Sequence, residues 1–308
     1  MRGITIRQLQ IFAEAAKQRS FARVAENLHI SAAGVSLQIK QIEQLAGLQL
    51  FERLGQHTDL TEAGEVLLRY SQTILQALQD ADEALSVLKG LQGGRIRLGV
   101  LSTAKYFAPR LISRFRSLYP GVQVSLAVSN RETIVQQLEH NDIDIAIMGR
   151  PPQGLDTVGQ PFARHPLVII CHPQHPLAQQ TRIEPQQLAG LPFLVRESGS
   201  GTRTAMEQFF AGHEVKIHID MVLPSNETIK QAVMAGLGLA FISRHTIDLE
   251  LHGRHVHLLP VAGTPVMREW HVVRRSGKPL TPALQAFEQL LLQAGQQLLD
   301  EASPGRDS

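Results

Sequence analysis

Residues 20–64 constrain the fold most strongly. They contain two short patterns, at 21–28 and 35–45, in which apolar residues recur every three or four positions, as on one face of a helix. The link at 29–31 is too short for an antiparallel hairpin of long helices, and Ser31 is a good N-cap, so we expect the helices to cross steeply. An apolar run at 48–51, a turn and Leu60 then predict a wing. The segment therefore predicts a winged helix-turn-helix, with an ordinary small helical domain as the alternative.

The outward face of the second helix would enter the major groove of DNA. Each basic candidate also has an alternative role as a solvated surface charge. The expected DNA-binding residues are Arg7, Arg23, Ser31, Ala32, Ala33, Ser36, Leu37, Gln38, Lys40 and Arg53. Among these, Arg23, Lys40 and Arg53 are the expected phosphate contacts, whereas Ala32, Ala33 and Gly34 offer few polar groups for reading bases.

The charge of the chain gives little support to nucleic-acid binding by itself. The 308 residues carry a net charge of +2, and residues 1–60 hold seven Lys or Arg against five Asp or Glu. A strong basic footprint is therefore missing, and we expect modest phosphate contact per subunit, with several subunits binding together.

Several other classes find little support. The N-terminal segment has no long apolar core, and no apolar run approaches the roughly 20 residues of a membrane helix, so we expect a cytoplasmic protein. Cys171 is the only cysteine, which excludes an internal disulfide framework. The histidines at 172 and 175 and at 252, 255 and 257 lack nearby carboxylate or cysteine ligands at suitable spacing, so we expect surface histidines, no metal and no cofactor.

Residues 61–91 form one continuous helical pattern. The apolar positions from Leu67 to Leu88 step by three or four and average 3.5 residues, which is the heptad period of a helix that pairs with a copy of itself. Packing of this helix within its own chain is the alternative. Gly90, Gly93 and Gly94 mark a hinge into the second part of the chain.

From Arg95 the pattern changes to alternating strands and helices, which is typical of parallel α/β units. Two such units are visible, and the words Ser-Asn followed by Glu-Thr-Ile occur in both, at 129–134 and at 225–229. The duplication predicts two lobes with a cleft between them. The expected strands are 96–101, 122–128, 143–148, 193–195, 216–221 and 239–242, and the expected helices 109–118, 132–140, 202–210 and 227–235.

The cleft is expected to bind an anion. Hydroxyl-rich segments follow the first strand of each lobe, glycines at 199 and 201 allow backbone N–H groups to converge, and a helix N-terminus favours negative charge. Capping and turn formation are the alternative roles of these residues. The expected effector-binding residues are Ser102, Thr103, Lys105, Asn130, Arg150, Ser200, Thr202, Arg203 and Asn226. We expect Arg203→Ala or Thr202→Val to abolish the effector response and leave DNA binding intact.

An enzyme is the rival class, because two-lobed α/β proteins can be catalysts. The chain has no P-loop, no Gly-x-Ser-x-Gly elbow and no Gly-x-Gly-x-x-Gly after a strand. Nor does Cys171 have a base beside it other than His172, whose side chain would point to the opposite face of a strand. We therefore expect no catalytic residues.

The first 64 residues resemble the N-terminal domain of LysR-type transcriptional regulators. The resemblance rests on Arg7-Gln8-Leu9, Phe12, Ser20-Phe21, Ala25, Leu28, Val35-Ser36, Gln38-Ile39, Leu45, Leu50-Phe51-Glu52-Arg53 and Leu60-Thr61-Glu62-Ala63-Gly64. That family usually has Ser-Gln-Pro-Ala where this chain has Ser31-Ala32-Ala33-Gly34, which removes an amide that could read a base. The resemblance implies dimerisation through the linker helix and a two-lobed effector domain like that of periplasmic binding proteins.

The C-terminal part is similar to the LysR regulators of Calvin-cycle carbon-fixation operons, which respond to phosphorylated metabolites. This similarity rests on residues 236–243, 245–247, 268–275, 277–278 and 280–283. Regulation of inorganic carbon or nitrogen uptake is the alternative, and an enzyme a remoter one. The partners implied are an interrupted palindrome of double-stranded DNA, a small anionic or phosphorylated metabolite, a second copy of the chain, and RNA polymerase. The resulting dimer is expected to pair again into a tetramer.

The expected fold class is thus α+β and α/β, in four segments. A winged helix-turn-helix spans 1–60 and a dimerisation helix 61–91. A two-lobed, type 2 periplasmic-binding-protein-like domain spans 92–300, with lobe I at 95–165 and 267–300 and lobe II at 166–266. A flexible tail spans 301–308.

Overall fold

The computed structural model describes residues 3–54, 57–88 and 93–301. The chain divides into two compact units, one made of residues 1–91 with 140–142 and the other of the remaining residues. Gly90, at the predicted hinge, and residues 302–308 of the predicted tail lie outside the described residues, as does the side chain of Arg53.

The first unit is a winged helix-turn-helix. Phe12, Val24, Val35, Ile42 and Leu50 are buried in one core to which every helix before the wing contributes. The first helix was not predicted, and a capping box starts it, because Thr5 Oγ1 accepts from the Gln8 backbone while the Gln8 side chain accepts from the Thr5 N–H. The elements are α1 (Ile6–Gln18), α2 (Phe21–Leu28), α3 (Ala32–Ala46), β1 (Phe51–Leu54), β2 (His57–Leu60) and α4 (Glu62–Leu88).

The turn between α2 and α3 is closed by backbone geometry. His29 takes the left-handed conformation at a φ of 54°, and its N–H bonds to the Ala25 and Glu26 carbonyls, which ends α2. Ser31 Oγ then accepts a hydrogen bond from Gly34 N at 3.0 Å and starts α3, as predicted.

Helix α4 begins at a tight junction with the wing. A side chain on Gly64 would place its Cβ 2.1 Å from the Leu50 carbonyl oxygen, so only glycine fits there. Leu67 is buried in the core of the first unit, but beyond it the predicted heptad positions turn to solvent: the exposed fraction of Tyr70 is 64%, and Ile74, Leu78 and Leu85 are also exposed. In the described chain, α4 therefore carries an apolar stripe without a covering.

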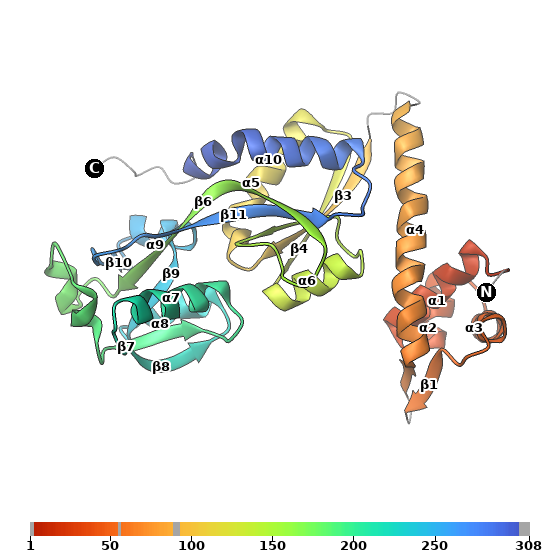
Figure 1. Ribbon diagram of the computed structural model, residues 1–308, viewed down its shortest axis with the longest axis horizontal. Helices are drawn as coiled ribbons and strands as arrows, with labels where there is room; N and C mark the ends of the chain where they lie inside the picture. The colour runs from red at the N-terminus through yellow and green to blue at the C-terminus, as the bar shows by residue number, and fades with distance from the viewer. Residues whose placement is uncertain (1–2, 55–56, 89–92, 302–308) are drawn as a thin grey trace. The chain divides into compact units, whose positions relative to one another are not determined.

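The second unit is built on a mixed sheet (Figure 1) with the strand order β4-β3-β5-β11-β6-β9-β7-β8 and β10 beside β6. The strands are β3 (Gly94–Leu101), β4 (Val122–Ser129), β5 (Ile145–Met148), β6 (Thr157–Cys171), β7 (Pro192–Arg196), β8 (His218–Leu223), β9 (Leu239–Ser243), β10 (His257–Leu258) and β11 (Val266–Arg275). The helices are α5 (Ala108–Leu118), α6 (Arg131–Glu139), α7 (Gly201–Gly212), α8 (Asn226–Met234), α9 (Asp248–His252) and α10 (Pro282–Asp300), with short 3-10 turns η1 (Ala104–Tyr106), η2 (Pro176–Gln179), η3 (Pro185–Leu188) and η4 (Arg244–Thr246).

The expected parallel pairing is found within each half. Strand β3 pairs in parallel with β4 and β5, and β7 with β8 and β9. The long strands β6 and β11, which were not predicted, are antiparallel to their neighbours and make the sheet mixed. They are long strands rather than strand-helix repeats, so the α/β period that guided the prediction does not include them.

Strands β6 and β11 connect the halves. Residues 157–167 of β6 pair with β11, and residues 167–170 pair with β9 of the second half. The ladder between β6 and β11 is interrupted once, by a register shift between Trp270 and His271. Each half has its own core, which contains Phe115, Trp270 and Phe287 in the first (lobe I) and Phe193 and Phe210 in the second (lobe II).

No helix in the described part of the chain is long and apolar enough to cross a membrane.

Candidate functional site

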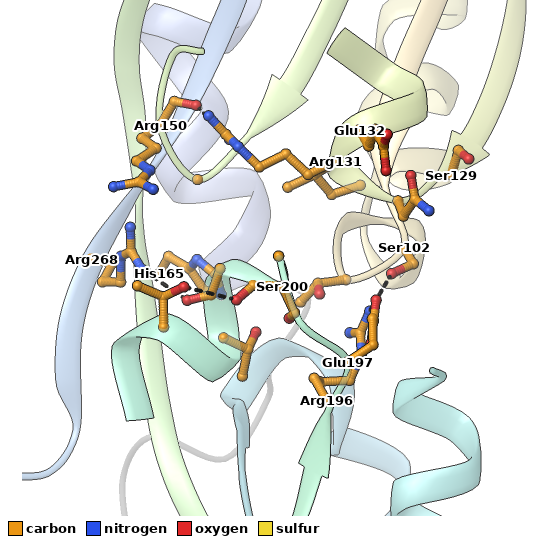
Figure 2. A pocket seen from close by; sticks show the side chains of 18 of the residues that line it. Ser102, Ser129, Arg131, Glu132, Arg150, His165, Arg196, Glu197, Ser200 and Arg268 are labelled. Carbon is orange, nitrogen blue, oxygen red and sulfur yellow. Dashed lines mark hydrogen bonds and ion pairs between the residues drawn. The ribbon is translucent and has the colours of Figure 1, made fainter. Parts of the chain in front are cut away.

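A cavity lies between the two lobes, at the carboxyl ends of their strands (Figure 2). Four guanidinium groups and two carboxylates line it, which leaves a net charge of +2: Arg131, Arg150, Arg196 and Arg268 against Glu132 and Glu197. Hydroxyl groups and the N-terminus of α7 complete the wall. A site of this composition attracts anions.

Most of the predicted effector residues lie at this cavity. The predicted residues in its wall are Ser102, Thr103, Asn130, Arg150, Ser200 and Thr202. Asn226 does not line the cavity but lies behind it, where its Nδ2 donates to Thr103 Oγ1 at 3.1 Å.

Lys105 and Arg203, which were expected to supply charge to the cleft, do not line this cavity. Lys105 is exposed, and its Nζ lies 5.1 Å from the centre of the Tyr106 ring. Arg203 Nε is 2.8 Å from Glu207 Oε1, and its NH1 donates to the Arg196 carbonyl at 3.2 Å. Proximity in sequence to a helix start does not fix the direction of a long side chain, and both residues point away.

Arg131, Arg150 and Arg268 form a guanidinium cluster without acidic partners. No carboxylate of the described residues forms an ion pair with any of the three. Arg131 donates to the carbonyls of Arg150 and Pro151, and Arg268 donates to the Gly201 carbonyl. Burial, followed by the charges of Arg150 and Arg268, lowers the pKa of Arg131, and burial with the Arg150 charge lowers that of Arg268. The cluster is therefore uncompensated and favours an anion.

The opposite wall is held by Arg196, whose charge is already paired. Its Nε and NH2 lie 2.7 and 2.8 Å from the two Glu197 oxygens, and its NH1 donates to Asn226 Oδ1 at 2.8 Å. Its NH2 also reaches Ser102 Oγ of lobe I at 3.4 Å. Figure 2 shows Ser102, Arg196 and Glu197 together, away from Arg150 and Arg268. Uncompensated positive charge is thus concentrated at the end of the cavity that holds Arg150 and Arg268.

The start of α7 adds backbone donors. Ser200 is the N-cap, but its side chain makes no capping hydrogen bond, so that N–H groups of the first turn have no side-chain acceptor there. Gly199 precedes it at a φ of 83°, which favours glycine.

Sequence reasoning missed the charged residues Arg131, Arg196 and Arg268 and the ring of His165. They come from the start of α6, the end of β7, and the long strands β11 and β6, respectively. The His165 ring stacks on Trp270 with centroids 3.9 Å apart. Arg196 and Arg131 could have been found, because each directly follows a predicted strand or precedes a predicted helix, whereas β6 and β11 gave no periodic signal.

The histidine and cysteine candidates lie elsewhere. Within the described ranges, no three His, Cys, Asp or Glu side chains are grouped as metal ligands. His172 and His175 accept hydrogen bonds from backbone N–H groups of their own turn. His257 begins the short strand β10, and His255 precedes that strand. Cys171 is buried, and burial raises the pKa of its thiol to about 12.

The candidate DNA face lies on the first unit. Ser31, Ala32, Ala33 and Lys40 are exposed, as is Leu37, while Ser36 and Gln38 are half-buried. Val35 and Ile39 on the opposite face are buried, so α3 is anchored on one side and open on the other. Arg7 and Arg23 are exposed on α1 and α2.

Comparison with known proteins identifies the class that this architecture defines. Residues 6–65 match the model of the bacterial regulatory helix-turn-helix protein, lysR family, and residues 89–296 match the LysR substrate binding domain. The chain belongs to the LysR family of DNA-binding transcriptional regulators and is not an enzyme.

Relatives extend over nearly the whole chain. It is 46% identical to the HTH-type transcriptional regulator CfxR of Cupriavidus necator, over 95% of this chain and 92% of the relative. It is 47% identical to the HTH-type transcriptional regulator CbbR of Rhodospirillum rubrum, over 92% and 94%. The solved regulatory domain of Synechocystis CcmR in complex with 2-PG is 38% identical, has a TM-score of 0.62, and corresponds to 69% of this chain and 99% of that one.

Proposed function

We propose that this LysR regulator controls a carbon-fixation operon and responds to a small phosphorylated anion bound between its lobes. The observation that carries the proposal is the guanidinium cluster of Arg131, Arg150 and Arg268, which faces a cavity and has no acidic partner among the described residues. Relatives that share 45% and 40% identity are described as RuBisCO operon transcriptional regulators. The CcmR domain bound to 2-PG, 2-phosphoglycolate, supports a phosphorylated ligand.

The proposed assembly is a dimer joined through α4, paired again into a tetramer. The apolar stripe of Tyr70, Ile74, Leu78 and Leu85 supports this, because an exposed seam at heptad spacing is the surface that a second copy would cover. Two or more copies of α3 would then bind the half-sites of an interrupted palindrome. Contact with RNA polymerase is the remaining part of the proposal.

The ligand would act by changing the angle between the lobes. It can do so only by binding one arrangement more tightly than the other, and a ligand that touches both walls of the cavity meets this condition. Arg131 and Arg150 belong to lobe I, the N-terminus of α7 belongs to lobe II, and Arg268 lies on the connecting strand β11. An anion bound among them would therefore contact both lobes and the strand β11 that connects them.

DNase I footprinting of the full-length protein on the promoter of a RuBisCO operon tests the proposal. We expect protection over two half-sites. When millimolar 2-phosphoglycolate is added, we expect a change in the length of the protected region or in the bend of the bound DNA. The proposal fails if protection is absent. It also fails if a panel of phosphorylated metabolites changes neither the footprint nor the midpoint of thermal unfolding of the protein.

A further inference from the structure

His165 is a buried side chain whose ring nitrogens are without partners. Its exposed fraction is 7%, and neither Nδ1 nor Nε2 has a hydrogen-bond partner in the described structure. A buried polar atom left unpaired costs free energy, and native proteins satisfy most of them. The wall of the cavity between the lobes includes this residue. A partner supplied by the bound ligand would remove the cost.

The ring is held in one orientation. It stacks on Trp270 at an interplanar angle of 17°, and the Trp270 side chain is fully buried in the core of lobe I. A methyl group on Gly149 would lie 3.9 Å from His165 Nδ1, so this nitrogen faces Gly149, another residue of the cavity wall. Nδ1 therefore lies on the side of the ring that faces Gly149.

The groups around the ring keep it uncharged. Burial, followed by the charges of His245 and Arg268, lowers the pKa of His165 well below its ordinary value. Those two groups come from η4 and from β11, and the His245 ring centroid lies 6.3 Å away. Near neutral pH the imidazole is neutral and offers one N–H donor and one acceptor. The neutral imidazole therefore offers a hydrogen bond beside the guanidinium cluster without adding a further positive charge.

We propose that His165 contacts the effector and forms a hydrogen bond to an oxygen of a phosphoryl group seated at the guanidinium cluster. The inference rests on the proposed function. A phosphate monoester has three terminal oxygens, enough to meet the guanidinium groups and the imidazole together, whereas a carboxylate has two. A protonated phosphoryl oxygen can also donate to the ring acceptor. The site therefore selects a phosphorylated compound over its unphosphorylated carboxylic acid.

Isothermal titration of the full-length protein with 2-phosphoglycolate, and separately with glycolate, tests the inference. His165→Phe keeps the ring stacking and removes both nitrogens, and we expect it to weaken 2-phosphoglycolate binding by about tenfold or more. His165→Gln restores a donor and an acceptor and should recover part of the affinity. Gly149→Ala adds a methyl group beside Nδ1 at ordinary contact distance, so it should fold normally and also bind more weakly.

The outcomes separate the two proposals. A structural role alone predicts that His165→Phe shifts the thermal midpoint of the free protein but binds the ligand as the native protein does, which would overturn the inference and leave the proposed function standing. If the native protein binds neither 2-phosphoglycolate nor inorganic phosphate, the phosphorylated effector and the inference fail together. Equal affinity for glycolate and 2-phosphoglycolate would refute the binding of a phosphoryl group at the guanidinium cluster.

Discussion

Asn226 Nδ2 donates a hydrogen bond to Thr103 Oγ1 at 3.1 Å, and both residues are buried although they belong to different lobes. The same Asn226 accepts from Arg196 NH1 through its Oδ1. One amide thus joins a hydroxyl of lobe I to a guanidinium of lobe II, directly behind the cavity. The twin of this residue in the duplicated motif, Asn130, is exposed and caps α6 through Thr133 N.

Asn226→Ala is expected to lower the free energy of unfolding of the second unit by about 1–3 kcal/mol, because Arg196 and Thr103 lose a buried partner. Asn130→Ala is the matched control, and the loss of its cap should cost about 1 kcal/mol or less. Urea denaturation of both variants measures the difference. Equal losses would contradict the buried bridge.

Arg150→Gln is expected to abolish the effector response without destabilising the protein, since it removes a cation that repels Arg131 and Arg268. Thermal shift with and without 2-phosphoglycolate measures both effects. Arg203→Gln is the control. Arg203 does not line the cavity, so we now expect this variant to keep the effector response that Arg203→Ala was expected to abolish. A lost response in Arg203→Gln with a normal one in Arg150→Gln would reverse the assignment.

The stability of the protein should depend on pH through His165. Its pKa is lowered in the folded state, so the unfolded chain takes up the proton first, near pH 6.5. Stability is therefore complete above about pH 6.5 and falls below it by up to about 1.4 kcal/mol per pH unit. His165→Phe should show a shallower slope than the native protein between pH 6.5 and pH 5 in urea denaturation, by up to about 1.4 kcal/mol per pH unit. Identical slopes would show that the group does not titrate there.

Ile74→Asp should convert the proposed dimer to monomers, because it places a charge in the apolar stripe of α4. Gln76→Asp lies about 200° around the helix from Ile74 and is the control. Sedimentation equilibrium at several concentrations distinguishes the species. A dimeric Ile74→Asp variant would place the interface elsewhere.

Lys40→Ala should weaken DNA binding to all sequences alike and reduce the slope of log affinity against log salt by about 0.9. Lys40 is exposed on α3 beside Leu37 and Ser36. Arg182→Ala removes the same charge from the second unit, where Arg182 pairs with Glu184, and should leave the slope unchanged. Fluorescence anisotropy at several salt concentrations gives the slopes.

Periodicity predicted most elements of the fold. The helix expected at 202–210 is α7, Gly201–Gly212, and the strand expected at 239–242 is β9, Leu239–Ser243. The strands β6 and β11 were missed as elements. Strand β6 has 15 residues and changes neighbours midway, so it has no single burial period. The hydrophobic pattern records which residues are inside, but not which strand lies beside which.

The cavity was predicted better by backbone than by charge. Ser102, Ser200 and Thr202 were located because a strand end fixes the position of short side chains. Lys105 and Arg203 were misplaced because a long side chain can turn toward a nearby ring or carboxylate, as both do. Arg268 and His165 become neighbours of the site only through the pairing of β11 with β6, which links residues far apart in sequence.

The single interruption in the ladder between β6 and β11 falls between Trp270 and His271. Trp270 and Arg268 line the cavity, so this register shift lies beside the proposed effector site. Continuous hydrogen-bonded strands resist a free swing. We therefore expect occupancy of the cavity to change the local twist of β6 and β11 at this register shift, and with it the angle between the lobes.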